Sequence, residues 1–468
     1  MMNAQSQDAA ETPQAADANG LSLALFTALY ELTMAQAYWQ SGHTDEATFS
    51  LFIRRYPQDR SYLVFAGIHD ILTYLEQLRF TDADIDYLRS LGRFDEDFLR
   101  FLSRLRFQGT VRAMAEGTIF FANEPVLEIT APVIEGQILE NYVLNRVNLQ
   151  TMLATKAARA AYAAQGRPVT EFGARRTPGL DAADQMARVG YMAGFAATGN
   201  VLAAARHGIT PAGTMAHSFI GAFPSEIDAF RAYARSFPDT AILLIDTYDV
   251  IEGARNAITV AQELRERGHR LAAVRLDSGD VLSLSRRVRA MLDEALLEDV
   301  GIVISGELDE FAIDELVRAD APINGFGVGT KIGSSADAPW TDAVYKLVEY
   351  ADAPVFKLST GKETLPGRKQ VYRRSTDDGR YSGDVVTLAD EPPPVGGAPL
   401  LQQVMQDGRR MRRDPSLNES RALFQRGFAN LPETVKALRG AAAYPVEVSS
   451  PLAELRARMT RAVAARPR

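Results

Sequence analysis

Between about residue 165 and residue 330, short apolar runs alternate with amphipathic segments, and no other feature of the chain constrains its fold as strongly. Runs that are apolar throughout are typical of strands buried on both faces of a parallel sheet. The segments between them, such as Ile251 to Leu264 and Leu284 to Ala295, have the spacing of helices that cover such a sheet. Six or seven such units in series favour a closed or nearly closed barrel over an open sheet. The predicted strands are Val169–Gly173, the run from Gly208 into Thr214, Ala241–Ile245, Leu271–Val274, Gly301–Ile304 and Ile323–Val328.

The segments on either side of this repeat are organised differently. A chain of 468 residues exceeds a usual single domain, and we divide it into a disordered leader at 1–19, an N-terminal α/β domain at 20–145 and a barrel domain at 146–354. The N-terminal part is predicted to contain helices at Leu21–Gln40 and Glu135–Ala164, a helical region with short breaks at 70–106, and strands at Ala47–Pro57 and within Thr118–Pro132. Beyond Lys346, strands are predicted at Val355–Ser359, Lys369–Arg373 and Tyr381–Thr387, a loop at Glu391–Pro399, and a basic amphipathic helix from Pro451.

Composition excludes several kinds of site and partner. The chain has no cysteine, which removes disulfides, thiol nucleophiles and thiolate metal ligands, and its five histidines are scattered. A net charge of −8 argues against nucleic acid as a partner, because phosphate binding requires a basic surface. No apolar run approaches membrane-spanning length and residues 1–20 lack the features of a signal peptide. A cytoplasmic protein with no membrane partner is therefore expected.

Polar residues gather where the predicted strands end, which is where α/β barrels carry their chemistry. Any single Asp, Ser or Thr in such a place can cap a helix, and capping is the favoured interpretation of Asp249, Ser278 and Asp280. Their presence at the ends of so many strands is harder to explain by capping alone. The strand ends carry Arg175-Arg176, His217-Ser218, Asp246-Thr247, Arg275 with Asp277, Ser305-Gly306-Glu307 and Gly327-Val328-Gly329-Thr330.

His217 is the only histidine placed where a predicted strand gives way to a loop. An imidazole in that position is nucleophilic and titrates near neutral pH, which suits proton or phosphoryl transfer. A lone histidine is more often structural, so the neighbouring strand ends decide between the two interpretations. Glycine-rich turns at Gly306 and Gly327–Gly329 follow consecutive strands, and barrels commonly hold a phosphate there with backbone N–H groups.

Two cations and two acids complete the set of residues at these strand ends. Arg175 and Arg275 would attract a phosphate, whereas Asp246 and Asp277 would repel it unless Mg²⁺ lay between them. The residues alone therefore predict a barrel enzyme that acts on a phosphosugar and depends on Mg²⁺. They do not identify a metal site that side chains would form by themselves. They leave the second substrate open.

In their order along the chain, these motifs resemble those of the nicotinate phosphoribosyltransferases. The resemblance runs from about Leu25 to Arg373, which is most of the chain. So many blocks in the family's order make the match highly specific. They are the segment from Tyr30 to Trp39, Phe52-Ile53-Arg54, Glu124-Pro125-Val126-Leu127, Glu171 to Arg176, Gly213 to Ser218, Val274 to Asp280, Gly327-Val328-Gly329-Thr330 and Tyr345-Lys346-Leu347-Val348.

The resemblance implies that nicotinate and 5-phosphoribosyl 1-pyrophosphate give nicotinate mononucleotide and pyrophosphate, the first step of NAD biosynthesis from nicotinate. Hydrolysis of ATP to ADP and phosphate would be coupled to this step, with Mg²⁺ as the metal. The implied fold is an irregular TIM-like α/β barrel beside an N-terminal α/β domain completed by C-terminal chain, with 355–468 partly packing on that domain. The implied assembly is a homodimer whose subunits share their active sites.

The resemblance also implies roles for individual residues. His217 would be phosphorylated transiently by ATP, Arg275 and Thr214 would contact nicotinate or its surroundings, and Asp246 and Asp277 would bind the ribose hydroxyls or the metal.

Further implied contacts come from both subunits. Tyr30 would stack on the pyridine ring in the neighbouring subunit's site, with that site's Phe172 on the other face, and Arg54 would reach pyrophosphate from the partner subunit. The 5-phosphate would be held by Gly306, Gly329 and Thr330, and Arg175 would be a further substrate contact.

One position departs from the pattern of related enzymes. The related nicotinamide phosphoribosyltransferases have an Asp, and many nicotinate enzymes a Ser, at the position that matches Gly199. The absence of an Asp favours nicotinate, because its carboxylate would be repelled there. Glycine also supplies no side chain for that carboxylate, and it can instead serve close packing at the start of the helix that ends at Gly208.

Three alternatives stay open at this point. Two share the chemistry, a nicotinamide and a quinolinate phosphoribosyltransferase, of which the second lacks an ATP-linked histidine. The third is a non-catalytic phosphosugar-binding barrel with a degraded site, and the intact set of Arg275, Asp277, His217, Gly329 and Thr330 argues against such decay.

Overall fold

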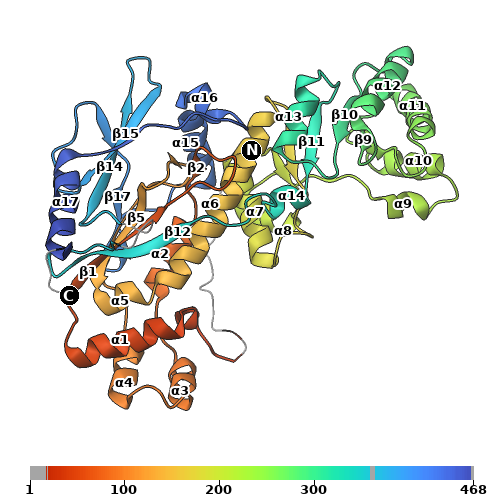
Figure 1. Cartoon of the computed structure of the whole chain (residues 1–468). Coiled ribbons are helices and arrows are strands. Elements are labelled where there is room, and N and C mark those ends of the chain that lie inside the picture. Colours follow the sequence, from red (N-terminus) through yellow and green to blue (C-terminus); the bar gives the residue numbers. More distant parts are fainter. Residues whose placement is uncertain (1–16, 18, 359–363, 465–468) are drawn as a thin grey trace, which may run out of the picture.

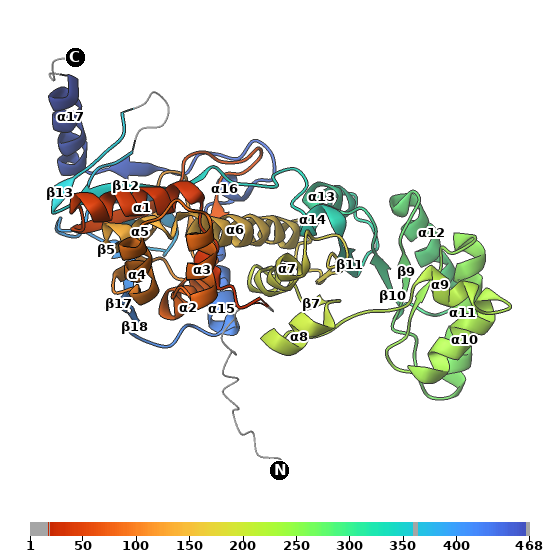
Figure 2. The same ribbon diagram turned by 90° about the horizontal axis from the view of Figure 1, so that it is seen from below.

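Two large sheets, one antiparallel and one parallel, organise the chain into two lobes. The structure, a computed structural model, describes residues 17, 19–358 and 364–464, so nearly all of the predicted leader at 1–19 lies outside the described residues. The lobes lie end to end in an elongated molecule, with α1 (Leu29–Ser41) toward one end and α9 to α12 at the other (Figure 1, Figure 2).

The N-terminal lobe (residues 19–139, 343–358 and 364–464) is built on a seven-stranded antiparallel sheet in the order β13-β12-β1-β5-β3-β17-β18. Strand β1, in the interior of this sheet, is buried on both faces after its first residue. The strands are β1 (Glu46–Ile53), β3 (Thr110–Ala113), β5 (Pro125–Pro132), β12 (Ala343–Tyr350), β13 (Ala353–Pro354), β17 (Gln402–Gln406) and β18 (Arg409–Arg410). A small pair, β2 (Leu63–Val64) and β4 (Ile119–Phe120), lies beside it. Its helices are η1 (Leu23–Leu25), α1, α2 (Ile68–Gln77), α3 (Asp82–Ser90), α4 (Glu96–Arg104) and α5 (Val133–Gln137).

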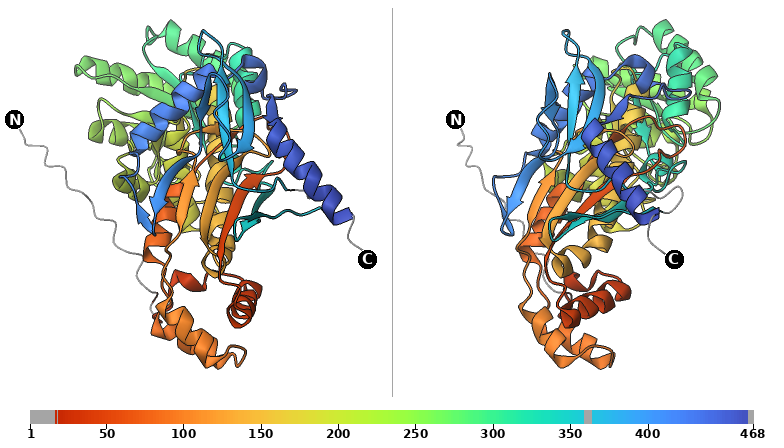
Figure 3. Two further views of the ribbon diagram at one scale, coloured as in Figure 1. Left: turned by 90° about the vertical axis from the view of Figure 1, so that its left-hand side faces the viewer. Right: turned by 60° about the vertical axis from the view of Figure 1, so that its left-hand side comes forward.

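The C-terminal chain adds a second, four-stranded sheet to this lobe, as the resemblance implies. It runs β16-β14-β15-β19, and α17 packs against β15 (Figure 3). Strands β14 and β15 confirm the two strands predicted there. The elements are β14 (Lys369–Ser375), β15 (Tyr381–Leu388), β16 (Gly397–Pro399), β19 (Val446–Val448), α15 (Leu417–Asn430), α16 (Glu433–Lys436) and α17 (Ser450–Ala464).

The parallel-sheet lobe (residues 164–342) contains six parallel strands in the order β7-β6-β11-β10-β9-β8. This confirms the α/β class and five of the predicted strands. The strands are β6 (Val169–Glu171), β7 (Ala197–Thr198), β8 (Ile242–Leu244), β9 (Ala273–Leu276), β10 (Gly301–Ile304) and β11 (Gly325–Val328). The helices are α7 (Leu180–Met192), α8 (Val201–His207), α9 (His217–Gly221), α10 (Glu226–Ser236), α11 (Val250–Glu266), α12 (Val281–Glu294), α13 (Glu310–Arg318) and α14 (Thr330–Gly333).

Helix α6 (Glu140–Ala163) joins the two lobes, since its first half packs in one hydrophobic core and its second half in the other. Val143 and Val147 belong to the core of the N-terminal lobe, whereas Leu153 and Ala157 belong to that of the parallel-sheet lobe. Small side chains in the second half let α7 and α13 approach α6 closely. The predicted boundary at 145/146 falls within this helix, and the domain limits stay a prediction.

Five predicted elements differ from the observed ones. The predicted loop Glu391–Pro399 ends in a strand, because Gly397–Pro399 form β16 beside β14. The strand from Gly208 into Thr214 is wrong, because only Pro211 makes a bridge, to Thr198. The long helix Glu135–Ala164 is two helices, α5 and α6. The predicted helix Leu21–Gln40 begins only at Leu29, as α1, because residues 23–25 form a separate turn that Ser22 caps. In the predicted strand Val355–Ser359, the described residues 355–358 are not in a strand.

No helix within the described ranges combines the length and the apolar character required to cross a bilayer.

Candidate active site

The predicted site residues of the parallel-sheet lobe meet at one edge of its sheet. All six strands run parallel, so their carboxyl ends lie on the same side. Asp246 follows β8, Asp277 follows β9, Ser305 follows β10, Gly329 follows β11 and Phe172 follows β6. This edge is called the rim below.

Hydrogen bonds between carboxylates and hydroxyls join three consecutive loops of the rim. Oδ2 of Asp246 accepts the backbone N–H of Asp277 at 2.9 Å and the hydroxyl of Ser278 at 2.7 Å. Oδ1 of Asp277 accepts the hydroxyl of Ser305 at 2.5 Å. The other oxygen of Asp246, Oδ1, is buried without a hydrogen-bond partner among the described residues. Such an oxygen is a strong acceptor that a bound group can satisfy.

Two of the three capping assignments are confirmed and one is wrong. Asp249 caps α11 by accepting from the N–H groups of Ile251 and Glu252, both at 2.9 Å, and Asp280 caps α12. Ser278 instead donates to Asp246 and so belongs to the rim.

Arg275 lies in β9 and donates from Nη1 to the hydroxyl of Thr214. Burial lowers the pKa of Arg275 and Arg175 acts in the same direction, while the carboxylates of Asp277 and Asp246 act in the opposite one. Its Nε is buried without a partner among the described residues. The rim therefore holds a partly desolvated cation with unused hydrogen-bonding capacity, which favours an anionic ligand.

His217 is the first residue of the short helix α9, with its side chain exposed. Its Nδ1 lies 3.1 Å from the hydroxyl of Thr247, the residue that follows Asp246. This contact ties the imidazole to the β8 loop and leaves Nε2 without a partner in the described part of the chain. The imidazole is thus oriented at one nitrogen and open at the other, as a nucleophile requires.

Two glycines hold the ring of Phe172 by its opposite edges. A Cβ atom at Gly199 would lie 2.8 Å from Cδ1 of Phe172, and one at Gly327 would lie 2.7 Å from Cε2. Both distances are too short for a real side chain. The close-packing interpretation of Gly199 is therefore confirmed, although the glycine packs against Phe172 rather than along its own helix.

Glu171, next to Phe172, fixes the backbone of this loop. One carboxylate oxygen accepts the N–H of Gly173 and the other accepts the hydroxyl of Thr198 at 2.6 Å. Burial raises the pKa of Glu171, and these hydrogen bonds oppose that effect.

The two glycine-rich loops predicted to hold a phosphate are adjacent on the rim, after β10 and β11. Gly306 has φ +111°, and a Cβ atom there would lie 2.5 Å from the carbonyl oxygen of Asp277, so this position requires glycine. Gly329 immediately precedes α14, whose first residue Thr330 is exposed.

Tyr30 and Arg54 lie in the N-terminal lobe, and the structure does not bring them to the rim of their own chain. Tyr30 is on α1, at the opposite end of the molecule from α9 and His217 (Figure 1). It is half exposed, and its hydroxyl donates to Glu140 at 3.1 Å. Arg54 follows β1, and its buried Nε has no partner among the described residues.

Thr247 and Ser305 contact the predicted site residues, but sequence reasoning gave them no role. Both stand among the polar residues at the predicted strand ends, which is the signal that could have identified them. Across the described residues, no three His, Cys, Asp or Glu side chains are arranged to hold a metal ion. A metal at the rim would therefore need oxygens from a substrate.

A cavity of about 1110 Å³ lies away from the rim, between α2 and the pair α7 and α8. Part of its polar lining is paired within itself, as in the contacts of Arg146 with Asp181 and of His207 with Asp184. We place the site at the rim, because the predicted site residues of the parallel-sheet lobe meet there.

Three family models match the chain. They are described as the nicotinate phosphoribosyltransferase N-terminal domain, the nicotinate phosphoribosyltransferase family and its C-terminal domain, at residues 25–148, 168–353 and 397–456. The nicotinate phosphoribosyltransferase pncB2 of Mycobacterium tuberculosis is 48% identical over 91% of this chain and 91% of its own length. That of Bacillus subtilis is 41% identical over 79% of this chain and 77% of its own. The crystal structure of human nicotinic acid phosphoribosyltransferase superposes with a TM-score of 0.82 at 32% identity, and covers 92% of this chain and 99% of that one.

Proposed function

The chain belongs to the nicotinate phosphoribosyltransferase family, and from that premise we propose how its rim performs the reaction and couples it to ATP. In the proposed reaction nicotinate, 5-phosphoribosyl 1-pyrophosphate, ATP and water give nicotinate mononucleotide, pyrophosphate, ADP and phosphate. The observation that carries the proposal is the joined set of Arg275, Thr214, Asp246, Asp277 and His217 on one rim. The nicotinamide and quinolinate alternatives are not favoured by the family match.

In the glycosyl transfer, the bond between ribose C1 and the pyrophosphate oxygen breaks while the pyridine nitrogen bonds to C1. Positive charge develops on the sugar, so Asp246 and Asp277 act by binding its hydroxyls and stabilising that charge. The partly desolvated Arg275, with Thr214, pairs with the carboxylate of nicotinate. This assignment supplies the carboxylate contact that Gly199 lacks. Phe172, held by its edges, offers a ring face on which the pyridine stacks.

ATP is proposed to react with the side chain of His217. Nε2 attacks the γ-phosphorus, the bond to the bridging oxygen breaks, and ADP leaves with the electron pair. Water later cleaves the phosphohistidine and releases phosphate. Thr247 holds Nδ1 throughout and so keeps Nε2 directed at the reacting phosphorus.

Mg²⁺ fits the acid pair on this rim. The buried Oδ1 of Asp246 has no partner among the described residues, and the backbone N–H of Asp277 bonds to Oδ2 of the same carboxylate. Mg²⁺ is usually held by one or two carboxylates together with phosphate oxygens, so Asp246 and Asp277 would hold it with the substrate. When bound, it would neutralise charge on the leaving pyrophosphate.

The protein is proposed to act as a homodimer with shared sites. Tyr30 lies on α1, at the opposite end of the molecule from α9 and His217, so a partner subunit would supply it together with Arg54. Exposed apolar side chains near the strand ends support a partner there: Leu180 is 92% exposed, Val201 72% and Trp340 69%. The cytoplasmic location expected from the sequence stays a prediction.

The proposal is tested by incubating the pure protein with 5-phosphoribosyl 1-pyrophosphate, Mg²⁺ and one of nicotinate, nicotinamide or quinolinate, with and without ATP. Mononucleotide formed from nicotinate, with ATP stimulating its synthesis, is the expected result. Product from nicotinamide or quinolinate alone would assign the chain to an alternative, and no product from any pyridine would indicate a binding barrel.

A further inference from the structure

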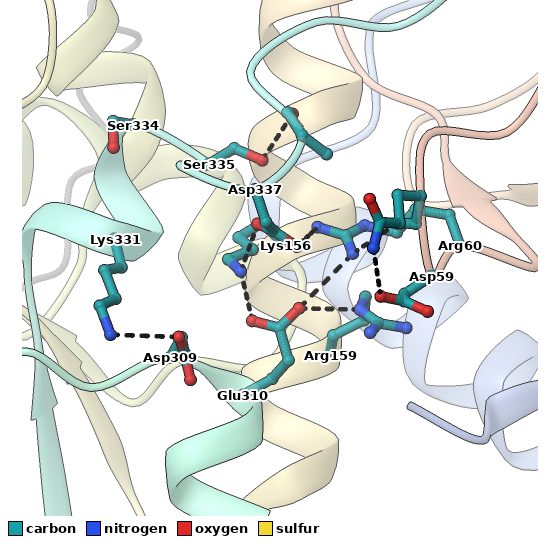
Figure 4. A network of polar contacts seen from close by, with 12 residues as sticks. Asp59, Arg60, Lys156, Arg159, Asp309, Glu310, Lys331, Ser334, Ser335 and Asp337 are labelled. Carbon is teal, nitrogen blue, oxygen red and sulfur yellow. Dashed lines mark hydrogen bonds and ion pairs between the residues drawn. The ribbon is translucent and has the colours of Figure 1, made fainter. Parts of the chain in front are cut away.

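Two carboxylates stand directly behind the loops proposed to hold the 5-phosphate. Glu310 begins α13, after the loop that contains Gly306, and Asp337 follows α14, which begins at Thr330. The ammonium group of Lys156 contacts both, pairing with Oε2 of Glu310 and donating to Oδ1 of Asp337 at 2.6 Å (Figure 4). One side chain of α6 therefore bridges the two loops.

Arg60 forms a second bridge between the same two carboxylates. Its Nη2 donates to Oδ2 of Asp337 at 2.9 Å, and its Nη1 lies 3.6 Å from Oε1 of Glu310 (Figure 4). Arg159 completes the group by donating to Oε1 of Glu310 at 2.9 Å and to the carbonyl of Leu438 at 2.9 Å. These five charged residues, namely Arg60, Lys156, Arg159, Glu310 and Asp337, are called the bridging cluster.

Burial makes the bridging cluster stiff. The side chains of Lys156, Arg159, Glu310 and Arg60 are 0–2% exposed, whereas that of Asp337 is 33% exposed. Ion pairs shielded from water are screened little, and loss of one partner leaves the others uncompensated. Burial acts to raise the pKa of Asp337, but the ammonium group of Lys156 and the guanidinium of Arg60 bring it below its usual value, so this carboxylate is held in its charged form.

Hydrogen bonds connect the segment that contains Asp337 to Thr330. The N–H and hydroxyl of Ser334 both bond to the carbonyl of Thr330, at 3.1 Å and 2.7 Å. Beyond Asp337, the N–H and hydroxyl of Thr341 both bond to Asn148 of α6, at 2.7 Å and 2.8 Å. The segment after β11 is thus fixed to α6 at two points and reaches the rim at its other end.

A third link joins the two loops without α6. Lys331, the second residue of α14, lies 3.3 Å from Oδ2 of Asp309, which caps α13. The two loops are therefore linked directly as well as through α6. We infer that Lys156, Arg60 and Lys331, which lie between them, set their separation.

We propose that Asp337 and Lys156 are positioning residues for the 5-phosphate group of the substrate, because they set the spacing of the two loops that receive it. This inference rests on the proposed function and deepens it. Neither residue touches the phosphate in this assignment. The N-terminal lobe takes part through Arg60, so the alignment of the two lobes is fixed at the same place.

The test compares Asp337→Asn and Asp337→Glu with the wild-type enzyme, full length and with Mg²⁺. In Asp337→Asn the amide cannot accept from both cations, so the loops lose their spacing, and we expect KM for 5-phosphoribosyl 1-pyrophosphate to rise about tenfold. KM for nicotinate and kcat should change much less, and Asp337→Glu should recover part of the loss. Asp314→Asn is the matched control, since Asp314 pairs with Arg318 at the far end of the same helix α13.

Binding measured without turnover gives a second readout. Ribose 5-phosphate should raise the Tm of the wild type and of Asp314→Asn, and should raise that of Asp337→Asn clearly less. An unchanged KM for 5-phosphoribosyl 1-pyrophosphate together with an undiminished Tm shift would overturn the inference. A loss confined to kcat or to Tm without ligand would also overturn it, because that pattern reports only folding. If Asp337→Asn does not fold, Asp337→Glu must show the selective rise in KM, and its absence refutes the inference. Failure of the wild type to make nicotinate mononucleotide would instead refute the proposed function.

Discussion

At the scale of single residues, the two nitrogens of His217 have different surroundings. Nδ1 is held by Thr247 and Nε2 is open, so the proposed phosphorylation is predicted to occur on Nε2. We predict that His217→Ala retains slow synthesis of nicotinate mononucleotide, with the ratio of rates with and without ATP falling to about 1. Initial rates at saturating nicotinate, with and without ATP, measure this ratio.

His269→Ala is the control for that variant. His269 is partly exposed and bonds to Asp239 at 2.9 Å, away from the rim residues, so its loss should leave the response to ATP intact. Full ATP stimulation in His217→Ala would contradict the phosphohistidine assignment.

Gly199 gives a second prediction at this scale. Even a methyl group there would lie 2.8 Å from the ring of Phe172, so Gly199→Ala should displace the ring and raise KM for nicotinate about tenfold. Steady-state kinetics in both substrates would show the effect on nicotinate alone. In a Phe172→Ala background the same substitution should have little further effect, because the clashing ring is gone.

Gly221→Ala is the matched control, since an added Cβ at Gly221 meets nothing within 4 Å. If Gly199→Ala leaves KM for nicotinate unchanged, the ring of Phe172 does not stack on the pyridine. An Asp at this position would meet the same ring, so the selectivity argument from charge alone is incomplete.

At the scale of secondary-structure elements, the residue that caps α11 is expected to contribute to stability but not to catalysis. Asp249 accepts from two N–H groups at the start of this helix but makes no contact with the rim residues among the hydrogen bonds described. We predict that Asp249→Ala lowers the free energy of unfolding by about 1 kcal/mol. Urea denaturation measures the loss, and KM for both substrates should stay unchanged. Asp249→Asn keeps an acceptor and should lose clearly less; a similar loss in both variants would refute the cap.

Strands buried on both faces could be predicted from sequence because their apolar runs are continuous. Gly301–Ile304 matches β10 residue for residue, and Ala241–Ile245 brackets β8. The run from Gly208 failed because Pro211 offers no N–H to a neighbouring strand and glycines flank it. Strand β7 was missed since its two residues carry no periodicity.

Part of the site could be predicted in the same way. In a parallel sheet, strand ends share one edge, so the meeting of Asp246, Asp277 and Ser305 follows from topology. The link from Arg275 to Thr214 and the seat of Phe172 between two glycines depend on loop conformations. Loop conformation is set by contacts distant in sequence, which no local pattern encodes.

At the scale of the whole molecule, the exposed apolar side chains beside the rim predict an assembly. A dimer has twice the chain mass of 51.3 kDa, or 102.6 kDa, and multi-angle light scattering should report that value. Leu180→Glu places a charge in the proposed contact and should shift the mass toward one chain and reduce turnover, because Tyr30 then leaves the partner's site.

Val395→Glu is the control for this variant, since Val395 is fully exposed on a distant loop of the N-terminal lobe. A monomeric wild type with full activity would refute the shared site.

The separation of Tyr30 from His217 along the molecule has a consequence for inheritance. A chain damaged at α1 still carries an intact rim, and a chain damaged at His217 still carries an intact α1. In the proposed dimer, the two intact halves of such a pair would meet in the same site, and a mixed population would regain roughly a quarter of the normal sites. Two alleles that each lack ATP-stimulated synthesis alone would then complement each other in one cell, whereas two lesions on the same chain would not.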